Sequence, residues 1–161
     1  MLISEVLNNA LNAQIREELG NQSQYLAIAA YFDREGLKLL AKLYYKQAEE
    51  ERDHAMRFLR FVIDAGGKIV IPAVAEPKNE IRSAEEAAQI ALDSEIRTTG
   101  QIYNLVTLAT SEKNYIAMNM LQWFVNEQLE EVSSAEARLS VIKRAGPTVL
   151  MVEAYLAHGE V

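Results

Sequence analysis

The sequence predicts an all-α protein: a four-helix bundle with a long crossover between its second and third helices, and a short fifth helix at the C-terminal end. Apolar residues recur with a helical period in four long segments, and the three prolines and most of the seven glycines lie outside them. Alternating strand patterns are nearly absent, and the one candidate stretch, KIVIPAV, contains a proline that argues against a strand. The four long segments run over residues 4–35, 37–65, 83–110 and 114–145.

The ends of these segments carry helix start and stop signals. The first segment stops at Gly36 and the second at Gly66. Ser83, followed three residues later by Glu86, is the capping-box pattern, in which each side chain satisfies a free backbone N–H. Residues 68–82 contain two prolines and are predicted to be extended. At roughly 3.3 Å per residue they can run the length of the bundle, so the second and third helices can be parallel.

A short fifth helix is predicted for residues 147–158. Gly146 stops the preceding helix, and Pro147 suits the first position of the next one. The segment is apolar around much of its circumference, a property that usually marks a protein–protein contact. We therefore expect one domain over residues 1–161, with the bundle over 4–145.

Composition narrows the classes of function. Half of the 161 residues are hydrophobic and 24% are charged, which is typical of a globular protein. The chain has no cysteine, so disulfides, thiolate metal sites and thiol catalysis are excluded. The net charge of -7 disfavours nucleic acid as a partner. We see neither a signal peptide nor an apolar run of membrane-spanning length, and we expect a cytoplasmic protein with no membrane partner.

Polar residues interrupt the apolar face of each long segment near its middle. In the second segment a carboxylate and an imidazole three residues apart share one helix face. An offset of 77 residues maps the first half of the chain onto the second, which is the pattern of an internal repeat of a helical hairpin. It takes Glu18, Glu51 and His54 onto Glu95, Gln128 and Glu131.

This repeated constellation favours a metal centre. An isolated Glu-x-x-His pair is more often a solvated or hydrogen-bonded pair than a ligand pair. Four carboxylates at one level of a bundle would repel one another and lose their hydration. Two divalent cations would balance their charge, and carboxylates with one nitrogen ligand suit iron. The pattern is that of a di-iron carboxylate bundle.

These residues resemble those of a ferritin, of the haem-free kind found in bacteria and archaea. The resemblance lies in REELGNQSQY, QAEEERDHAM, the glutamate of LDSEIRTTG, and FVNEQLEEV preceded by LQW, and it covers nearly the whole chain. The first iron site that it implies consists of Glu18, Glu51 and His54, with Gln128 nearby. The second consists of Glu51, Glu95 and Glu131, so that Glu51 bridges the two.

The resemblance also implies residues around the di-iron centre. Tyr25 matches a tyrosine held near that centre, although an ordinary core aromatic is an equal alternative. A third iron site would use Glu50, Glu127 and Glu130, which are predicted to face away from the core stripe. For these three the alternative is a solvated acidic surface. Glu153 and His158 of the fifth helix are candidates to face a channel where copies of that helix meet. For His158 the alternative is a solvated last-turn residue favoured by the helix dipole.

Two differences from bacterioferritins narrow the subfamily that this chain resembles. Bacterioferritins carry a second Glu-x-x-His in the last long helix, where this chain has Gln128 and Glu131. They also hold haem through a methionine directly after the bridging glutamate, where this chain has Arg52. No haem is therefore expected.

The expected function is that of an iron-storage ferritin with ferroxidase activity, in which dioxygen or hydrogen peroxide oxidises Fe(II). The resemblance implies a homo-oligomeric shell of 24 subunits that holds ferric mineral. One alternative is a di-iron oxidase or peroxidase that stores nothing. Another is a non-enzymatic helical interaction protein whose buried acids are protonated or bridged by water.

Overall fold

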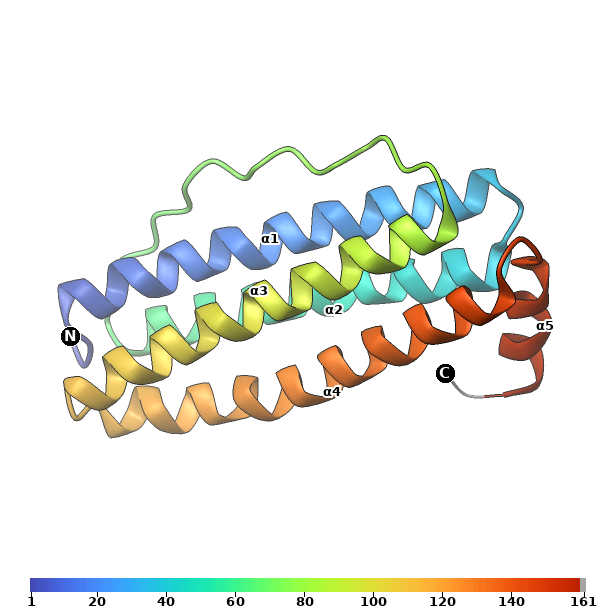
Figure 1. Ribbon diagram of the computed structural model, residues 1–161. Helices are drawn as coiled ribbons and strands as arrows, with labels where there is room; N and C mark the ends of the chain where they lie inside the picture. The colour runs from blue at the N-terminus through green and yellow to red at the C-terminus, as the bar shows by residue number, and fades with distance from the viewer. Residues whose placement is uncertain (160–161) are drawn as a thin grey trace.

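The computed structural model describes residues 1–159, which form five helices and no strand. Figure 1 shows four long helices lying side by side, with the fifth set across one end. α1 and α2 form one antiparallel hairpin and α3 and α4 a second, whereas α2 and α3 run parallel. The predicted fold class is confirmed. The helices are α1 (Glu5–Arg34), α2 (Lys38–Asp64), α3 (Ala84–Ser111), α4 (Tyr115–Ala145) and α5 (Leu150–His158).

The helix boundaries follow the local signals closely. Gly36 and Gly66 adopt φ values of 78° and 75°, a conformation that costs glycine little and other residues more. At the start of α3, the Ser83 hydroxyl accepts a hydrogen bond from the Glu86 N–H at 3.0 Å. The Glu86 carboxylate accepts from the N–H of Arg82, one residue before the position that a standard capping box uses.

The start of α5 was predicted incorrectly. Pro147 lies in a tight turn and the α-helix begins at Leu150, because residues between them make shorter, i to i−3 backbone bonds. The N–H of Thr148 donates to the Ala145 carbonyl, and that of Met151 to Thr148. Such bonds wind the chain more tightly than an α-helix, so this stretch turns the chain across the end of the bundle.

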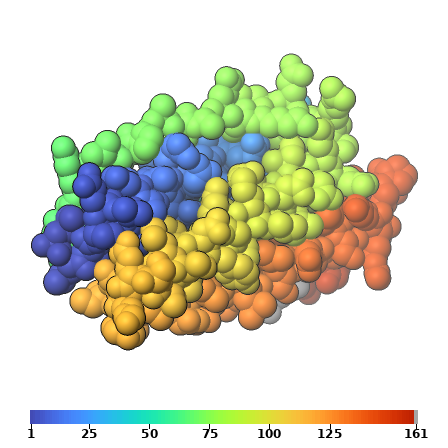
Figure 2. Space-filling model, turned by 60° about the vertical axis from the view of Figure 1, so that its left-hand side comes forward, coloured from blue at the N-terminus to red at the C-terminus, as the bar shows by residue number. Residues whose placement is uncertain are grey.

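Residues 67–83 cross from α2 to α3 without regular structure and lie along the outside of α1 (Figures 1 and 2). Side-chain amides of α1 replace the backbone bonds that a neighbouring strand would supply. Asn8 bonds both the N–H and the carbonyl of Lys68, and Asn12 bonds the Val70 N–H. Gln24 does the same for Lys78 further along. The crossover is thereby attached to α1 at both ends.

The apolar core is divided into two parts. One cluster lies towards the end that carries α5 and includes Phe32 and Tyr44, while the other lies towards the N-terminal end and includes Phe58 and Phe124. Aromatic stacking reinforces both clusters, with ring centroids 5.4 Å apart in the first pair and 3.9 Å in the second. The polar residues of the predicted metal centre occupy the layer between these clusters.

α5 is attached to α2 by hydrogen bonds to a carboxylate, as well as through its one buried residue, Val152. α2 begins after Leu37, whose side chain cannot accept a hydrogen bond. The Glu153 carboxylate supplies the cap instead, accepting from the N–H groups of Leu39 and Leu40 at 2.8 and 2.9 Å. A carboxylate at a helix N-terminus also interacts favourably with the helix dipole. Glu153 is thus bound to α2 within its own chain, and that it faces a channel between copies of α5 stays a prediction.

Replacing Glu153 with alanine should lower the free energy of unfolding by about 1 kcal/mol, the usual effect of removing an N-cap. A change to glutamine should have a smaller effect, because the amide oxygen can still accept. Glu136 is an exposed residue of α4, and its change to alanine is the matched control. Thermal unfolding of the three variants measures this, and an alanine variant as stable as the control would contradict the capping role.

Candidate metal centre

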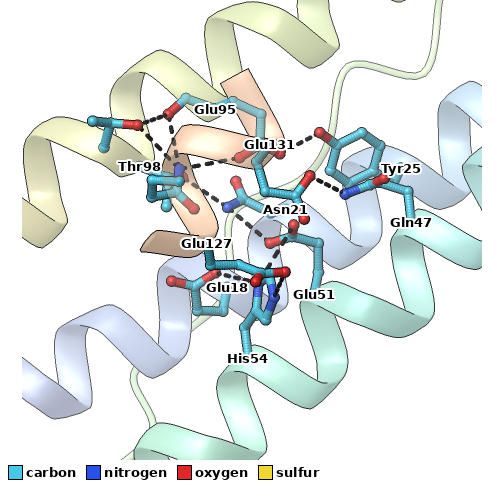
Figure 3. Close-up of polar contacts among 12 residues, drawn as sticks. Glu18, Asn21, Tyr25, Gln47, Glu51, His54, Glu95, Thr98, Glu127 and Glu131 are labelled. Atoms are coloured by element: carbon cyan, nitrogen blue, oxygen red, sulfur yellow. Dashed lines mark hydrogen bonds and ion pairs between the residues drawn. The ribbon is translucent and has the colours of Figure 1, made fainter. Parts of the chain in front are cut away.

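The six predicted ligands meet in the polar layer at the middle of the bundle (Figure 3). α1 supplies Glu18, α2 supplies Glu51 and His54, α3 supplies Glu95, and α4 supplies the other two. None of the six is more than 6% exposed, so none can be explained as a solvated surface residue. The two from α4 are Gln128 and Glu131.

Glu18, Glu51 and His54 form the tightest group. His54 Nδ1 lies 3.9 Å from Glu18 Oε2 and 3.7 Å from Glu51 Oε1. Those two oxygens are buried and have no hydrogen-bond partner among the described residues. A buried carboxylate oxygen without a partner is costly. Two of them facing one imidazole within 4.8 Å make a donor set that a divalent cation would satisfy.

The other oxygen of each of these carboxylates is already bonded. Gln14 Nε2 donates to Glu18 Oε1 at 2.8 Å, and Asn21 Nδ2 donates to Glu51 Oε2 at 3.3 Å. Amides of α1 therefore bond the oxygens that do not face His54, and only the unpartnered oxygens face its imidazole. This division of the oxygens gives the group the geometry of a preformed cation site.

The acids of the second half are arranged differently. Glu95 Oε1 accepts from the Tyr25 hydroxyl, and its Oε2 accepts from Gln128 Nε2 at 3.2 Å. Glu131 Oε2 accepts from Gln47 Nε2 at 2.6 Å. Because these carboxylates are turned towards their partners, Glu51, Glu95 and Glu131 do not form a group with ligand spacing among residues 1–159.

A second group with ligand spacing combines His54 and Glu131 with Glu127. Glu127 Oε1 lies 3.7 Å from His54 Nε2, and its side chain is 26% exposed. The prediction that Glu127 faces away from the core is therefore incorrect: directly before Gln128 and one turn before Glu131, it reaches the edge of the polar layer. Glu50 pairs with Lys46 near the surface at 3.5 Å, and Glu130 is exposed.

Burial raises the pKa of all four carboxyl groups in the layer. The pKa values of Glu18 and Glu51 lie well above the ordinary range, because of burial first and the charge of neighbouring glutamates second. Burial also raises the pKa of Glu95. The pKa of Glu131 rises to about 7, through burial and then the charge of Glu95. Without a cation, the layer therefore holds protons that a cation would displace.

The amides that donate to these acids, Gln14, Asn21 and Gln47, were not predicted from the sequence. Helical spacing alone could have placed the first two beside Glu18, because they lie four residues before it and three after it. Gln47 lies four residues before Glu51 in the same way. Asn21 and Thr98 also correspond at the repeat offset, and Asn21 donates to the Thr98 hydroxyl at 2.9 Å.

Known proteins match this chain in both its sequence and its bundle fold. The family model of the ferritin-like domain matches residues 8–145. The chain is 37% identical over 147 residues to Ferritin BfrB of Mycobacterium tuberculosis, covering 91% of this chain and 81% of that protein. It is 34% identical over 145 residues to a bacterial non-heme ferritin of Staphylococcus epidermidis, covering 90% and 87%. An open pore ferritin of the archaeon Archaeoglobus fulgidus superposes with a TM-score of 0.93 at 35% identity, covering 99% of each chain.

The raised pKa values predict that the protein without metal becomes less stable as pH rises. Glutamates with folded-state pKa values above their unfolded values stabilise the fold fully below about pH 4.5, and this contribution is lost as pH rises through the folded values. For Glu131 the pH window of this loss reaches the folded-state pKa of about 7. Melting temperatures in chelator should therefore fall between pH 5 and pH 8, and Zn(II) should restore them at the upper end.

Glu131→Gln is the matched variant for this measurement, because it keeps the Gln47 contact site but cannot ionise. Its melting temperature in chelator should depend less steeply on pH than that of the unchanged protein. Equal slopes for the two proteins would refute the assignment of the loss to the buried carboxylates.

Proposed function

This chain belongs to the ferritin family, and from that premise we propose that it oxidises Fe(II) in its carboxylate layer and stores the product as ferric mineral. The observation that carries the proposal is the pair of unpartnered carboxylate oxygens facing His54. The relatives support it, since one of them is named a bacterial non-heme ferritin.

In the proposed reaction two Fe(II) ions are substrates. The first is bound by Glu18, Glu51 and His54, through the oxygens that lack partners. The second is bound on the α3 and α4 side, where Glu131 lies close to His54. Glu95 would join after a rotation that releases Tyr25 or Gln128. Glu51 belongs to the first group and would bridge to the second.

The electron balance requires two ions. Each Fe(II) gives one electron, and dioxygen takes up the two electrons with two protons to form hydrogen peroxide. Where hydrogen peroxide is the oxidant, the same two electrons and two protons yield two water molecules. The chain binds and orients the ions, and its buried carboxylates stabilise the higher charge of Fe(III). Tyr25 lies beside the reacting layer through its bond to Glu95, and Gln128 orients the same carboxylate.

Storage requires a closed assembly, and we propose a homo-oligomeric shell of 24 subunits in the cytoplasm. α5 supports an assembly: Leu150, Met151 and Tyr155 are 70%, 62% and 49% exposed. One bundle end cannot cover a helix that is apolar around much of its circumference, so a second copy of the chain is the natural partner. Among the described residues, no helix is long and apolar enough to cross a membrane.

Iron loading under air, followed by size exclusion with light scattering, tests this proposal. The unchanged protein should elute as one large particle that carries more iron than the two ions per chain of the proposed site, because mineral adds to the bound ions. Glu51→Ala should give a particle of the same size with little iron, because the first ion loses a ligand. A protein that oxidises iron without retaining it would favour the non-storing oxidase. A protein that binds no metal would favour the non-enzymatic interaction protein.

A second prediction concerns the third iron site of Glu50, Glu127 and Glu130. Changing all three to alanine should leave the initial oxidation of Fe(II) fast, because the ligands Glu18 and Glu51 remain. The amount of iron consumed per oxygen should change if a third ion supplies electrons. Oxygen-electrode measurements with known iron additions decide this, and an unchanged ratio would identify these glutamates as a solvated acidic surface.

A further inference from the structure

Two carboxylates of the layer are held by the same kind of three-residue chain of hydrogen bonds. In the first, Arg97 Nη2 donates to Asn21 Oδ1 at 3.2 Å, and Asn21 Nδ2 donates to Glu51 Oε2 at 3.3 Å. In the second, Arg138 Nη1 donates to Gln47 Oε1 at 3.3 Å. Gln47 Nε2 then donates to Glu131 Oε2 at 2.6 Å. Each chain runs arginine, amide, glutamate.

The arginine determines which way the amide faces. A guanidinium only donates, so the amide must present its oxygen to the arginine and its NH2 group to the other side. The NH2 group is thereby left for the glutamate oxygen. If the amide were reversed, its NH2 group would face the guanidinium, and the contact between these two donors would be repulsive. The arginine therefore keeps the amide donating to one oxygen of the glutamate.

Both chains pass through a buried amide and end on a glutamate of the layer. Asn21 and Gln47 are buried, Arg97 is exposed, and Arg138 is half-buried. Arg97 and Asn21 line a cavity of about 610 Å³ between α1, α3 and the crossover, so the arginine can be changed without removing core volume. At the inner end, Glu51 and Glu131 lie in the two groups with ligand spacing (Figure 3).

We propose that Asn21 and Gln47, each oriented by its arginine, are positioning residues that hold Glu51 and Glu131 in the rotamers needed for cation binding. This proposal rests on the proposed function only in taking those glutamates as ligands. The amide occupies one oxygen of each carboxylate, and the other oxygen of Glu51 stays directed towards His54 when no cation is bound. After an oxidised ion leaves, the same contact returns the glutamate to its starting position.

Binding of Co(II), a redox-stable substitute for Fe(II), tests the proposal through both its affinity and its visible absorption. Asn21→Leu and Gln47→Leu should weaken binding by about 10- to 100-fold, the usual effect of removing a partner that orients a ligand. Their absorption bands should shift, because the ligand geometry changes. Arg97→Met should give a smaller loss, and Arg97→Lys should recover most of it because lysine also only donates.

A double-mutant cycle tests whether the arginine and the amide act together as one chain of hydrogen bonds. Arg97→Met should add nothing in the Asn21→Leu background, because the arginine acts through the amide. The control is Asn12→Leu, which removes a buried amide of α1 that bonds only backbone groups of α1 and the crossover. It should lower the melting temperature and leave the affinity for Co(II) unchanged.

The outcomes separate the two proposals. If the unchanged protein does not bind Co(II), the proposed function fails. If it binds Co(II), but Asn21→Leu and Gln47→Leu bind it with the same affinity and spectrum, the positioning role is overturned. An equal loss of affinity in Asn12→Leu would also overturn it, because the effect would then be general loosening of α1.

Discussion

Two carboxylate oxygens without hydrogen-bond partners, Glu18 Oε2 and Glu51 Oε1, impose the constraint on which this structure depends. Burying an ionised carboxylate costs several kcal/mol unless another charge compensates. The helices offset this free-energy cost by burying large apolar clusters on both sides of the polar layer. The layer is therefore at the middle of the bundle, where four helices can each contribute a ligand and where water is excluded.

α1 organises the molecule on two faces at once. On its outer face, Asn12 and Gln24 hold the crossover, which lets α3 run parallel to α2. On its inner face, Gln14 and Asn21 hold the carboxylates of Glu18 and Glu51. The same chemistry, a side-chain amide that both donates and accepts, serves the topology outside and the site inside. The crossover and the metal centre therefore depend on the same helix.

The internal repeat produces a bundle that is nearly symmetric and a site that is not. The repeat offset that relates Glu18 to Glu95 also relates Asn21 to Thr98, and these two bond each other across the layer. In the first half both glutamates keep an unpartnered oxygen, and an imidazole faces them. In the second half an amide, Gln128, corresponds to Glu51, and the carboxylates of Glu95 and Glu131 are bonded to Tyr25 and Gln47. Two ions bound here would therefore experience different ligands.

The sequence by itself determined the fold class, the helix boundaries to within a few residues, and the level at which six polar side chains meet. It could do so because helical periodicity assigns each residue to a face, and because glycine, proline and capping residues act locally. The acidic and imidazole donor set, which indicates a site for iron, is likewise a matter of residue type and spacing.

Only the tertiary structure decided which oxygen of each carboxylate is free. That choice depends on partners from other helices, such as Asn21 for Glu51, and no spacing within one helix specifies them. The contact of Glu127 with His54 and the capping of α2 by Glu153 were decided in the same way. The physical reason is that periodicity places a Cβ atom on a face, whereas the rotamer beyond it is selected by hydrogen bonds that exist only once the helices have packed.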